Sequence, residues 1–360
     1  MQAEEGVPNP NGGDAESLVL EHVAKLSATT DIKQLDRVFL EGACSLLPFD
    51  YVLLHLVTAK GRESRFMRGR DPTTLRYQSS WRQDALSDRQ ALLVRESIRV
   101  ASLVESAAGR DRRMVALSRQ STRGSTVSVI AQYPRTVDRS SVAAFDAFSA
   151  IYLNFREFID TSQRDPLTGL LNRRYFDDCI ADSLDVLSSG NQLTCVDPLR
   201  RSTDSRHARH WLAILDIDHF KRFNDAYGHL YGDEILLLFS RIMERTFRES
   251  DLLFRFGGEE FVVIMENASA EEAMGALERF RAAIHDYRFP GGETVTVSCG
   301  AIEIKGSLSP AWLLGKADEA LYYVKKSGRN RTEMYEDLVA QGKLSEQVSS
   351  AGEVELFQDE

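Results

Sequence analysis

Cysteine is scarce in this 360-residue sequence, and the cysteines that are present form no paired motif. Four of them are scattered along the chain without a CxxC pair: Cys44, Cys179, Cys195 and Cys299. This pattern excludes a disulfide scaffold or a zinc module and is typical of a reduced intracellular protein.

Long apolar runs are also missing, since none approaches the roughly 20 residues that a membrane-spanning helix needs. Residues 1–14 are acidic and rich in Gly, Pro and Asn, and they lack the basic and apolar regions of a signal peptide. We therefore expect a cytoplasmic protein without direct membrane insertion, in which residues 1–14 are a disordered lead.

Positive charge is in deficit, because the formal net charge is −10. An acidic chain is a poor partner for nucleic acid, which requires a basic surface. A local cluster of Arg and Lys still permits binding of a small phosphorylated molecule. Hydrophobic residues make up 43% of the sequence, enough to form two cores, and the length suggests at least two domains.

The first half of the chain mixes helical and strand patterns. Apolar residues recur at helical spacing between residues 15 and 47, which predicts two helices joined near Thr29–Asp31. Tyr51–Val57 is a β-rich run that predicts a strand. Residues 114–117 and 126–133 predict a pair of strands, and Ser140 and Ser141 predict the start of a further helix.

This last helix carries an apolar seam about five turns long, with spacings of three and four residues. The seam consists of Val142, Phe145, Phe148, Ile151, Tyr152, Phe155, Phe158 and Ile159. Two interpretations remain open: the helix packs on the core of its own domain, or it pairs with the same helix of a second copy.

The second domain is predicted at residues 165–336, where helical and strand patterns alternate. Residues 186–210 interrupt it with a polar, aperiodic stretch that predicts a surface loop. The chain after Glu336 is polar and ends in acidic residues, so we expect residues 337–360 to be a mobile tail.

Two acidic residues follow a buried strand in the sequence Leu212–Asp218. Asp216 and Asp218 are two residues apart, so on a strand both side chains point the same way. Carboxylates at the end of a buried strand suit Mg²⁺, which binds one or two of them together with water and phosphate oxygens. An ordinary strand end is the alternative.

A second acidic pair lies in a predicted β-hairpin, in the sequence Arg255–Phe261. We expect Gly257 and Gly258 to supply positive φ angles and to let a ligand approach the backbone. Glu259 and Glu260 follow at once. A hairpin alone requires neither glutamate, so the two acidic clusters together predict a shared metal site.

With these motifs the chain resembles the GGDEF-domain diguanylate cyclases, in the variant that reads GGEEF. The resemblance covers residues 165–336, nearly half of the chain. Its motifs occur in the order Asp165–Arg174, Asp216–Lys221, Asn224–Asp233, Gly257–Phe261, Ser298–Gly300, Ala317–Tyr322 and Lys325–Asn330. It implies an α+β fold of the ferredoxin-like, nucleotidyl-cyclase palm type, with a central antiparallel sheet flanked by helices.

The resemblance also implies an activity, which is the condensation of two GTP into cyclic di-GMP. Asp216, the backbone carbonyl of Ile217 and Glu259 would hold Mg²⁺, two ions per GTP, with Mn²⁺ as a substitute. Glu259 would also be the base for the attacking 3′-hydroxyl, with Lys221 and Glu260 in supporting roles. The residues implied in substrate binding are Asn224, His229, Asp233, Gly257, Gly258, Lys325, Arg329, Phe220 and Leu167.

Two further implications concern assembly and control. In this family each domain binds one GTP, so a chain with a single such domain requires a homodimer. Arg248 and Asp251 match the RxxD inhibitory site of the family, and Arg279 falls where a third contact to the product is often found. Arg residues suit bidentate contacts with phosphate and guanine.

The order of elements in residues 15–160 resembles a GAF-like α/β sensory or dimerisation domain, with an unknown ligand or protein partner. The competing hypotheses for the whole chain are a catalytically weak cyclic di-GMP receptor and a signalling scaffold. Receptors of this kind have lost the acidic residues, whereas this chain retains Asp216, Glu259 and Glu260, which favours the enzyme.

Overall fold

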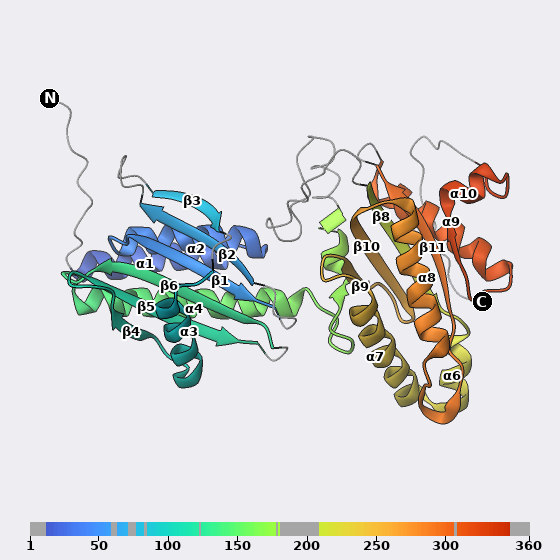
Figure 1. The fold of residues 1–360 in the computed structure, drawn as a ribbon, viewed down its shortest axis with the longest axis horizontal. Helices are drawn as coiled ribbons and strands as arrows, with labels where there is room; N and C mark the ends of the chain where they lie inside the picture. The colour runs from blue at the N-terminus through green and yellow to red at the C-terminus, as the bar shows by residue number, and fades with distance from the viewer. Residues whose placement is uncertain are drawn as a thin grey trace. The chain divides into compact units, whose positions relative to one another are not determined.

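The computed structural model describes residues 12–58, 63–70, 77–82, 85–121, 124–177, 179–180, 209–305 and 308–345. The chain divides into two units, Met1–Ser162 and Gln163–Glu360, and each has its own six-stranded sheet (Figure 1). Across the described ranges, no helix combines the length and the hydropathy needed to cross a bilayer.

The first unit is built on an antiparallel sheet with strand order β3-β2-β1-β6-β5-β4. Its elements are α1 (Gly12–Ser27), α2 (Ile32–Leu46), β1 (Tyr51–Val57), β2 (Glu63–Arg70), β3 (Tyr77–Arg82), α3 (Asp88–Val100), β4 (Val104–Ala107), β5 (Arg112–Gln120), β6 (Thr126–Pro134) and α4 (Arg139–Ser162). The two early helices and the three predicted strands are confirmed. The expected disordered lead lies outside the described residues, apart from residues 12–14, which begin α1.

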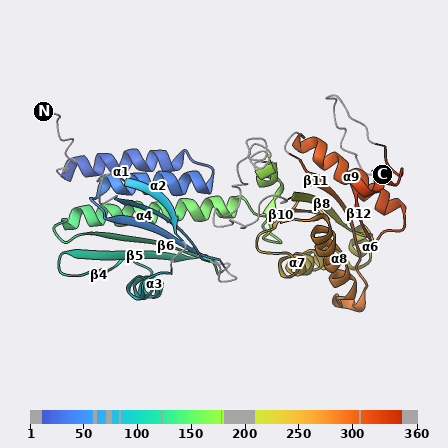
Figure 2. The same ribbon diagram turned by 45° about the horizontal axis from the view of Figure 1, so that its top comes forward.

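Alternation of side chains along the strands divides the first unit into two cores. On β6, Val129 and Ala131 face the larger core, which α1, α2 and α4 cover, whereas Ile130 faces a smaller core under α3. Figures 1 and 2 show α3 alone on one face of the sheet and the other three helices on the opposite face. A sheet with both faces covered needs apolar side chains in both registers, and β6 supplies them.

The capping residue of helix α4 lies two residues before the position that the sequence suggested. The carboxylate of Asp138, rather than the hydroxyl of Ser140 or Ser141, accepts the backbone N–H of Ser141 at 2.8 Å. Asp and Ser are both good N-cap residues, and here they lie close together in the sequence. The carboxylate of Asp138, the stronger acceptor, is the one that caps the helix.

The apolar seam of α4 packs on its own domain. Phe145, Phe148 and Tyr152 are fully buried against α1, α2 and the sheet, and Ile159 is 5% exposed. Phe158 lies on the other side of the helix and is 69% exposed. The first of the two interpretations is therefore correct for the buried residues, which are not available to a second copy.

The second unit contains a sheet with strand order β12-β11-β8-β10-β9-β7. Its three central pairings, β11 with β8, β8 with β10 and β10 with β9, are antiparallel, and only the outer pairs are parallel. The elements are β7 (Leu171–Asn172), β8 (Arg209–Ile217), α6 (Phe220–Tyr227), α7 (His229–Thr246), β9 (Leu252–Arg255), β10 (Glu260–Ala268), α8 (Ala270–Asp286), the 3₁₀ turn Pro290–Gly292, β11 (Val297–Ile304), α9 (Pro310–Lys326), β12 (Thr332–Met334) and α10 (Tyr335–Ala340). The predicted antiparallel sheet flanked by helices is confirmed.

Strand β8 is the centre of this unit and is apolar in both registers. Ala213 and Leu215 face the core under α6, α7 and α8, whereas Leu212 and Ile214 face the core under α9 and α10. Helices therefore cover both faces, as Figure 1 shows for α7 and α8 on one side and α9 on the other. A strand buried on both faces positions whatever follows it rigidly.

Two expectations about loops need correction. Arg209 and His210, the last residues of the expected loop 186–210, begin β8 instead, and residues 186–208 lie outside the described part of the chain. The mobile tail expected from residue 337 does not begin there, because α10 continues to Ala340 and Leu338 is fully buried; residues 346–360 lie outside the described part of the chain. The apolar side chain of Leu338 packs in the core beside α9, and this burial stabilises α10 against the polar character of the surrounding sequence.

Candidate active site

The two acidic motifs meet at the end of strand β8. Glu260 is the antiparallel partner of Asp216, and the backbone N–H of Ile217 lies 3.4 Å from the carbonyl oxygen of Glu259. The motifs are more than 40 residues apart in the sequence, so only the pairing of β8 with β10 brings them together. The carboxylates of Asp216, Glu259 and Glu260 therefore come from the neighbouring ends of two adjacent strands.

Asp216 is a buried carboxylate with a cation beside it. Its residue is 5% exposed, and the Nζ atom of Lys325 on α9 lies 2.9 Å from Oδ2. Burial raises the pKa of Asp216 to about 6, and the neighbouring Glu260 and Asp218 act in the same direction, while Lys325 opposes them. A carboxylate that is this costly to ionise has a strong affinity for a positive charge.

Asp218 does not share this environment, although it follows Asp216 by two residues. It lies just after β8, is 3% exposed, and accepts hydrogen bonds from the hydroxyls of Thr296 and Ser298. The two side chains therefore have different partners, although on a strand they would point the same way. The strand ends at Ile217, so the alternation that would align the two side chains ends there as well.

The hairpin between β9 and β10 closes through the amides of Phe256 and Gly257, which donate to the carbonyl of Glu260. Neither Gly257 nor Gly258 has a positive φ angle, so that expectation was wrong. The two glycines matter instead because they have no side chain. A Cβ on Gly257 would lie 2.7 Å from Oε2 of Glu260, whereas one on Gly258 would meet nothing within 4 Å. Gly258 thus exposes its backbone to an approaching ligand.

A residue that the sequence analysis overlooked fixes this hairpin. Arg255 donates through Nη1 to both carboxylate oxygens of Asp165, at 3.1 and 3.2 Å, and through Nη2 to the carbonyl of Gly258 at 2.9 Å. Asp165 is itself held by the backbone and hydroxyl of Thr168. Both residues belong to sequence motifs, Asp165–Arg174 and Arg255–Phe261, but nothing in the sequence indicates that they pair with each other.

The residues expected to read the base lie on α6 and α7. Asn224 packs so closely on α7 that a Cβ on Gly232 would lie 2.0 Å from its Oδ1 atom. His229 and Asp233 are exposed in the first turns of α7, and Lys221 is exposed on α6. Solvent therefore reaches all three, as a nucleotide site requires.

Two residues expected to bind substrate contribute to the core. Phe220 is 5% exposed and lies in the core under α7, and Leu167 is half-buried and packs against the same core. Phe220 therefore has little surface to offer a ligand and holds α6 in place.

Lys325 and Arg329 lie where α9 ends. The backbone turns through Gly328, Arg329 and Asn330 with φ angles of 105°, 60° and 46°. The N–H of Arg329 donates to the carbonyl of Val324, which ties the turn to the last turn of the helix. Two consecutive non-glycine residues in the left-handed region require such anchoring. Lys325 on the last turn of α9 lies beside Asp216, and Arg329 follows it in the turn.

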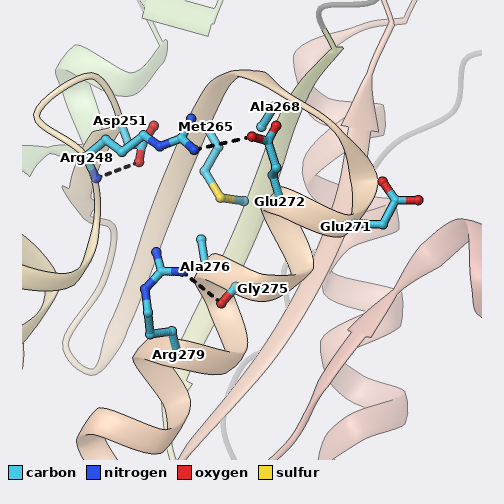
Figure 3. A pocket seen from close by; sticks show the side chains of 9 residues that line it. All are labelled: Arg248, Asp251, Met265, Ala268, Glu271, Glu272, Gly275, Ala276 and Arg279. Carbon is cyan, nitrogen blue, oxygen red and sulfur yellow. Dashed lines mark hydrogen bonds and ion pairs between the residues drawn. The ribbon is translucent and has the colours of Figure 1, made fainter.

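The three residues expected at an inhibitory site line one pocket of about 260 Å³, at some remove from this edge (Figure 3). Arg248 and Asp251 come from the turn between α7 and β9, and Arg279 comes from α8. Asp251 accepts the backbone N–H of Arg248 at 2.9 Å, and the guanidinium of Arg248 lies 3.5 Å from Glu272. Arg279 donates to the carbonyls of Gly275 and Thr246. The remaining lining residues are Met265, Ala268, Glu271, Glu272, Gly275 and Ala276.

The donors at the end of β8 suit a hard cation that keeps other ligands. Within the described ranges, no three His, Cys, Asp or Glu side chains are grouped so that they could hold a metal ion by themselves. One buried carboxylate, the Ile217 carbonyl and the hairpin glutamates are oxygen donors, and such a partial set is what Mg²⁺ uses when phosphates supply the rest. The residues present therefore fit Mg²⁺.

Comparison with known proteins agrees with this geometry. Residues 162–331 match the family model described as diguanylate cyclase, GGDEF domain. The probable diguanylate cyclase DgcC of Escherichia coli is 38% identical over 177 residues, which are 48% of this chain and 43% of that protein. The diguanylate cyclase DgcP of Pseudomonas aeruginosa is 38% identical over 173 residues, 47% of this chain and 23% of that protein.

Among solved structures, the GGDEF domain of DgcB from Caulobacter crescentus, in complex with c-di-GMP, is 32% identical. That match covers 49% of this chain and 96% of that chain, with a TM-score of 0.41. This chain spans less than half the length of either curated relative named above. The matched segment, residues 162–331, is a GGDEF domain of the diguanylate cyclase type.

Proposed function

We propose that this protein is a diguanylate cyclase that condenses two GTP into cyclic di-GMP and two diphosphates. The observation that carries the proposal is the register of β8 and β10, which joins Asp216 to the Gly-Gly-Glu-Glu hairpin. Lys325 at 2.9 Å from Asp216 adds a cation where a triphosphate would lie. The names of the relatives support the same activity.

The reaction makes one phosphodiester bond per GTP. The 3′-oxygen of one nucleotide attacks the α-phosphorus of the other, and the bond from that phosphorus to the diphosphate breaks. Glu259 accepts the proton of the 3′-hydroxyl, and Lys221, Lys325 and Arg329 offset charge on the phosphates. Such phosphoryl transfer depends mainly on positioning and electrostatics.

Asp216, the Ile217 carbonyl and Glu259 would hold Mg²⁺, with Glu260 in support. When bound, the metal would neutralise phosphate charge, and Mn²⁺ has the same preference for oxygen ligands. Asn224 and Asp233 would read the guanine edge, with His229 nearby. A carboxylate that accepts from guanine N–H groups rejects adenine, which leaves it unpaired.

Two assembly features belong to the proposal. The family model matches one segment of this chain, so two chains must face each other to make a product with two equivalent halves. The pocket of Arg248, Asp251 and Arg279 would bind cyclic di-GMP and mediate product inhibition, because two guanidinium groups beside a carboxylate suit phosphate and guanine together.

The first unit would serve as a GAF-like sensory domain that regulates the second. Its supporting features are a six-stranded antiparallel sheet covered on both faces and a closing helix, α4, that leads into residue 163. Its signal would be a small ligand or a protein, acting in the cytoplasm.

The test is turnover by the full chain after bound nucleotide has been removed. Purified protein is incubated with GTP and Mg²⁺, and the nucleotides are followed by chromatography. Glu259→Gln should abolish cyclic di-GMP formation without changing the unfolding midpoint, whereas Asp286→Asn, which removes a charge from an exposed position on α8, should leave it intact. Activity retained in Glu259→Gln would contradict the assignment of metal and base.

A second candidate function, a receptor for cyclic di-GMP, is favoured only by the pocket on α8. Titration of the stripped protein with cyclic di-GMP distinguishes the two functions, because a receptor binds it but makes none. Arg248→Ala should relieve inhibition by the product at least tenfold while leaving the initial rate unchanged. Unaltered inhibition would mean that the product acts elsewhere.

A further inference from the structure

Asp218 is bonded by both of its carboxylate oxygens. Oδ1 accepts the hydroxyl of Ser298 at 2.6 Å, and Oδ2 accepts the hydroxyl of Thr296 at 2.6 Å and the backbone N–H of Asn330 at 3.1 Å. The residue is 3% exposed. A buried carboxylate with three donors around it is already satisfied, and moving it to a metal would leave those donors unpaired.

The segment that Asp218 holds is the turn after α9. Gly328, Arg329 and Asn330 all have positive φ angles, and a left-handed conformation is unfavourable for the two that are not glycine. The turn persists because neighbouring groups hold it on both sides of Arg329. On one side, the N–H of Arg329 donates to the carbonyl of Val324. On the other side, the N–H of Asn330 donates to Asp218.

Two further contacts support this segment. Nη1 of Arg281 on α8 donates to Oδ1 of Asn330 at 2.8 Å, and the N–H of Cys299 donates to the carbonyl of Arg331 at 3.0 Å. The hydroxyl partners of Asp218, Thr296 just before β11 and Ser298 on β11, bring the start of that strand to the same point. The bond from Asn330 to Asp218 is the contact in which a full negative charge meets the backbone of the turn, so it is charge-assisted.

We infer that Asp218 is a positioning residue and not a ligand of the metal. It acts through the Asn330 N–H to fix the turn that presents Arg329 to the triphosphate. The motif Asp216-Ile-Asp218 thus divides its work, because the first aspartate offers a carboxylate to the cation and the second orients a phosphate-binding arginine more than 100 residues later. This inference rests on the proposed function for the role of Arg329.

The test compares three single variants of the full chain, one double variant and one control. Asp218→Ala should lower kcat/KM for GTP about tenfold, and Asp218→Asn, which keeps an acceptor oxygen and the shape, should restore most of that loss. Arg329→Ala should cost a similar factor, and Asp218→Ala combined with Arg329→Ala should be no worse than Arg329→Ala alone, because residues that act through one another are not additive. Ser298→Ala, which leaves the Asn330 bond intact, is the control.

Two readouts separate positioning from metal binding. The Mg²⁺ concentration for half-maximal turnover should stay within about twofold in Asp218→Asn, because Asn replaces an acceptor but not an anionic ligand. Hydrogen exchange at residues 328–330 in the nucleotide-free protein should accelerate about tenfold in Asp218→Ala and not in Ser298→Ala. A tenfold higher Mg²⁺ requirement, or no rescue by Asn, would overturn the inference.

The exchange measurement also separates this inference from the proposed function. If the wild-type protein makes no cyclic di-GMP but exchange accelerates in Asp218→Ala, the proposed function fails while the anchoring of the turn stands. If turnover is confirmed and the losses of Asp218→Ala and Arg329→Ala multiply, Asp218 does not act through Arg329 and the inference fails.

Discussion

The contact between Arg255 and Asp165 leads to a prediction about how the hairpin is held. Arg255 is 16% exposed and Asp165 18% exposed, and two of the three hydrogen bonds from the guanidinium reach the carboxylate. Replacing Arg255 by Ala leaves a mostly buried carboxylate with only its bonds to Thr168. Breaking a pair of this kind costs about 2–4 kcal/mol, less than for a fully buried pair.

The effect on activity should exceed the effect on folding. The third bond holds the carbonyl of Gly258, which directly precedes Glu259. A shift of about 1 Å in a reacting group costs on the order of a hundredfold in rate. We therefore expect Arg255→Ala to lower kcat about a hundredfold in the fraction that remains folded. Arg255→Lys should lie between, because one ammonium group cannot reach Asp165 and Gly258 as a planar fork does.

The assay combines two measurements on each variant. Urea unfolding gives the loss of stability, and cyclic di-GMP formation per folded molecule at 10 °C gives the catalytic loss. Arg241→Ala, at an exposed position on α7, is the control for removing a guanidinium. If Arg255→Ala loses stability by the expected amount but keeps its kcat, the pair serves folding alone and the positioning argument is refuted.

Two further predictions concern stability and base recognition. His210 is 6% exposed, and burial lowers its pKa from 6.5 to about 4. The unfolded chain therefore binds a proton more readily than the folded chain. The free energy of unfolding should fall by about 3 kcal/mol as the pH drops from 6.5 to 4. Urea titrations of His210→Phe should lack this dependence, and an unchanged pH slope would contradict it. Gly232→Ala places a Cβ 2.0 Å from Oδ1 of Asn224 and should raise KM for GTP at least tenfold. The control is Gly315→Ala on α9, whose Cβ would meet nothing within 4 Å and should leave KM unchanged. Equal KM values for the two variants would mean that Asn224 does not read the base.

The amino-acid sequence alone determined the local elements and the chemistry of the motifs. Short β-rich runs predicted β1, β5 and β6, and helical spacing predicted α1, α2 and α4, because the preferences of the residue types and their spacing act locally along the backbone. The order of the acidic, glycine and basic motifs pointed to one family, and the matched segment agrees with it.

The hairpin glycines show a limit of this reasoning. Positive φ is the usual reason for Gly-Gly in a turn, yet here the reason is the space that Glu260 occupies beside Gly257. A side chain that folds back on its own turn cannot be recognised from the residue types. The apolar seam of α4 is similar, because a seam has the same spacing whether it meets its own core or a second copy.

Only the tertiary structure decided which polar groups meet. On a continuous strand Asp216 and Asp218 would point the same way, but β8 ends at Ile217. Asp216 therefore pairs with Lys325, whereas Asp218 bonds to Thr296, Ser298 and Asn330. Arg255 and Asp165 are 90 residues apart and become partners through the pairing of β7 with β9. Periodicity is a property of neighbours along the chain, whereas hydrogen bonds between distant segments depend on how sheets and helices pack, and packing is settled by the whole core at once.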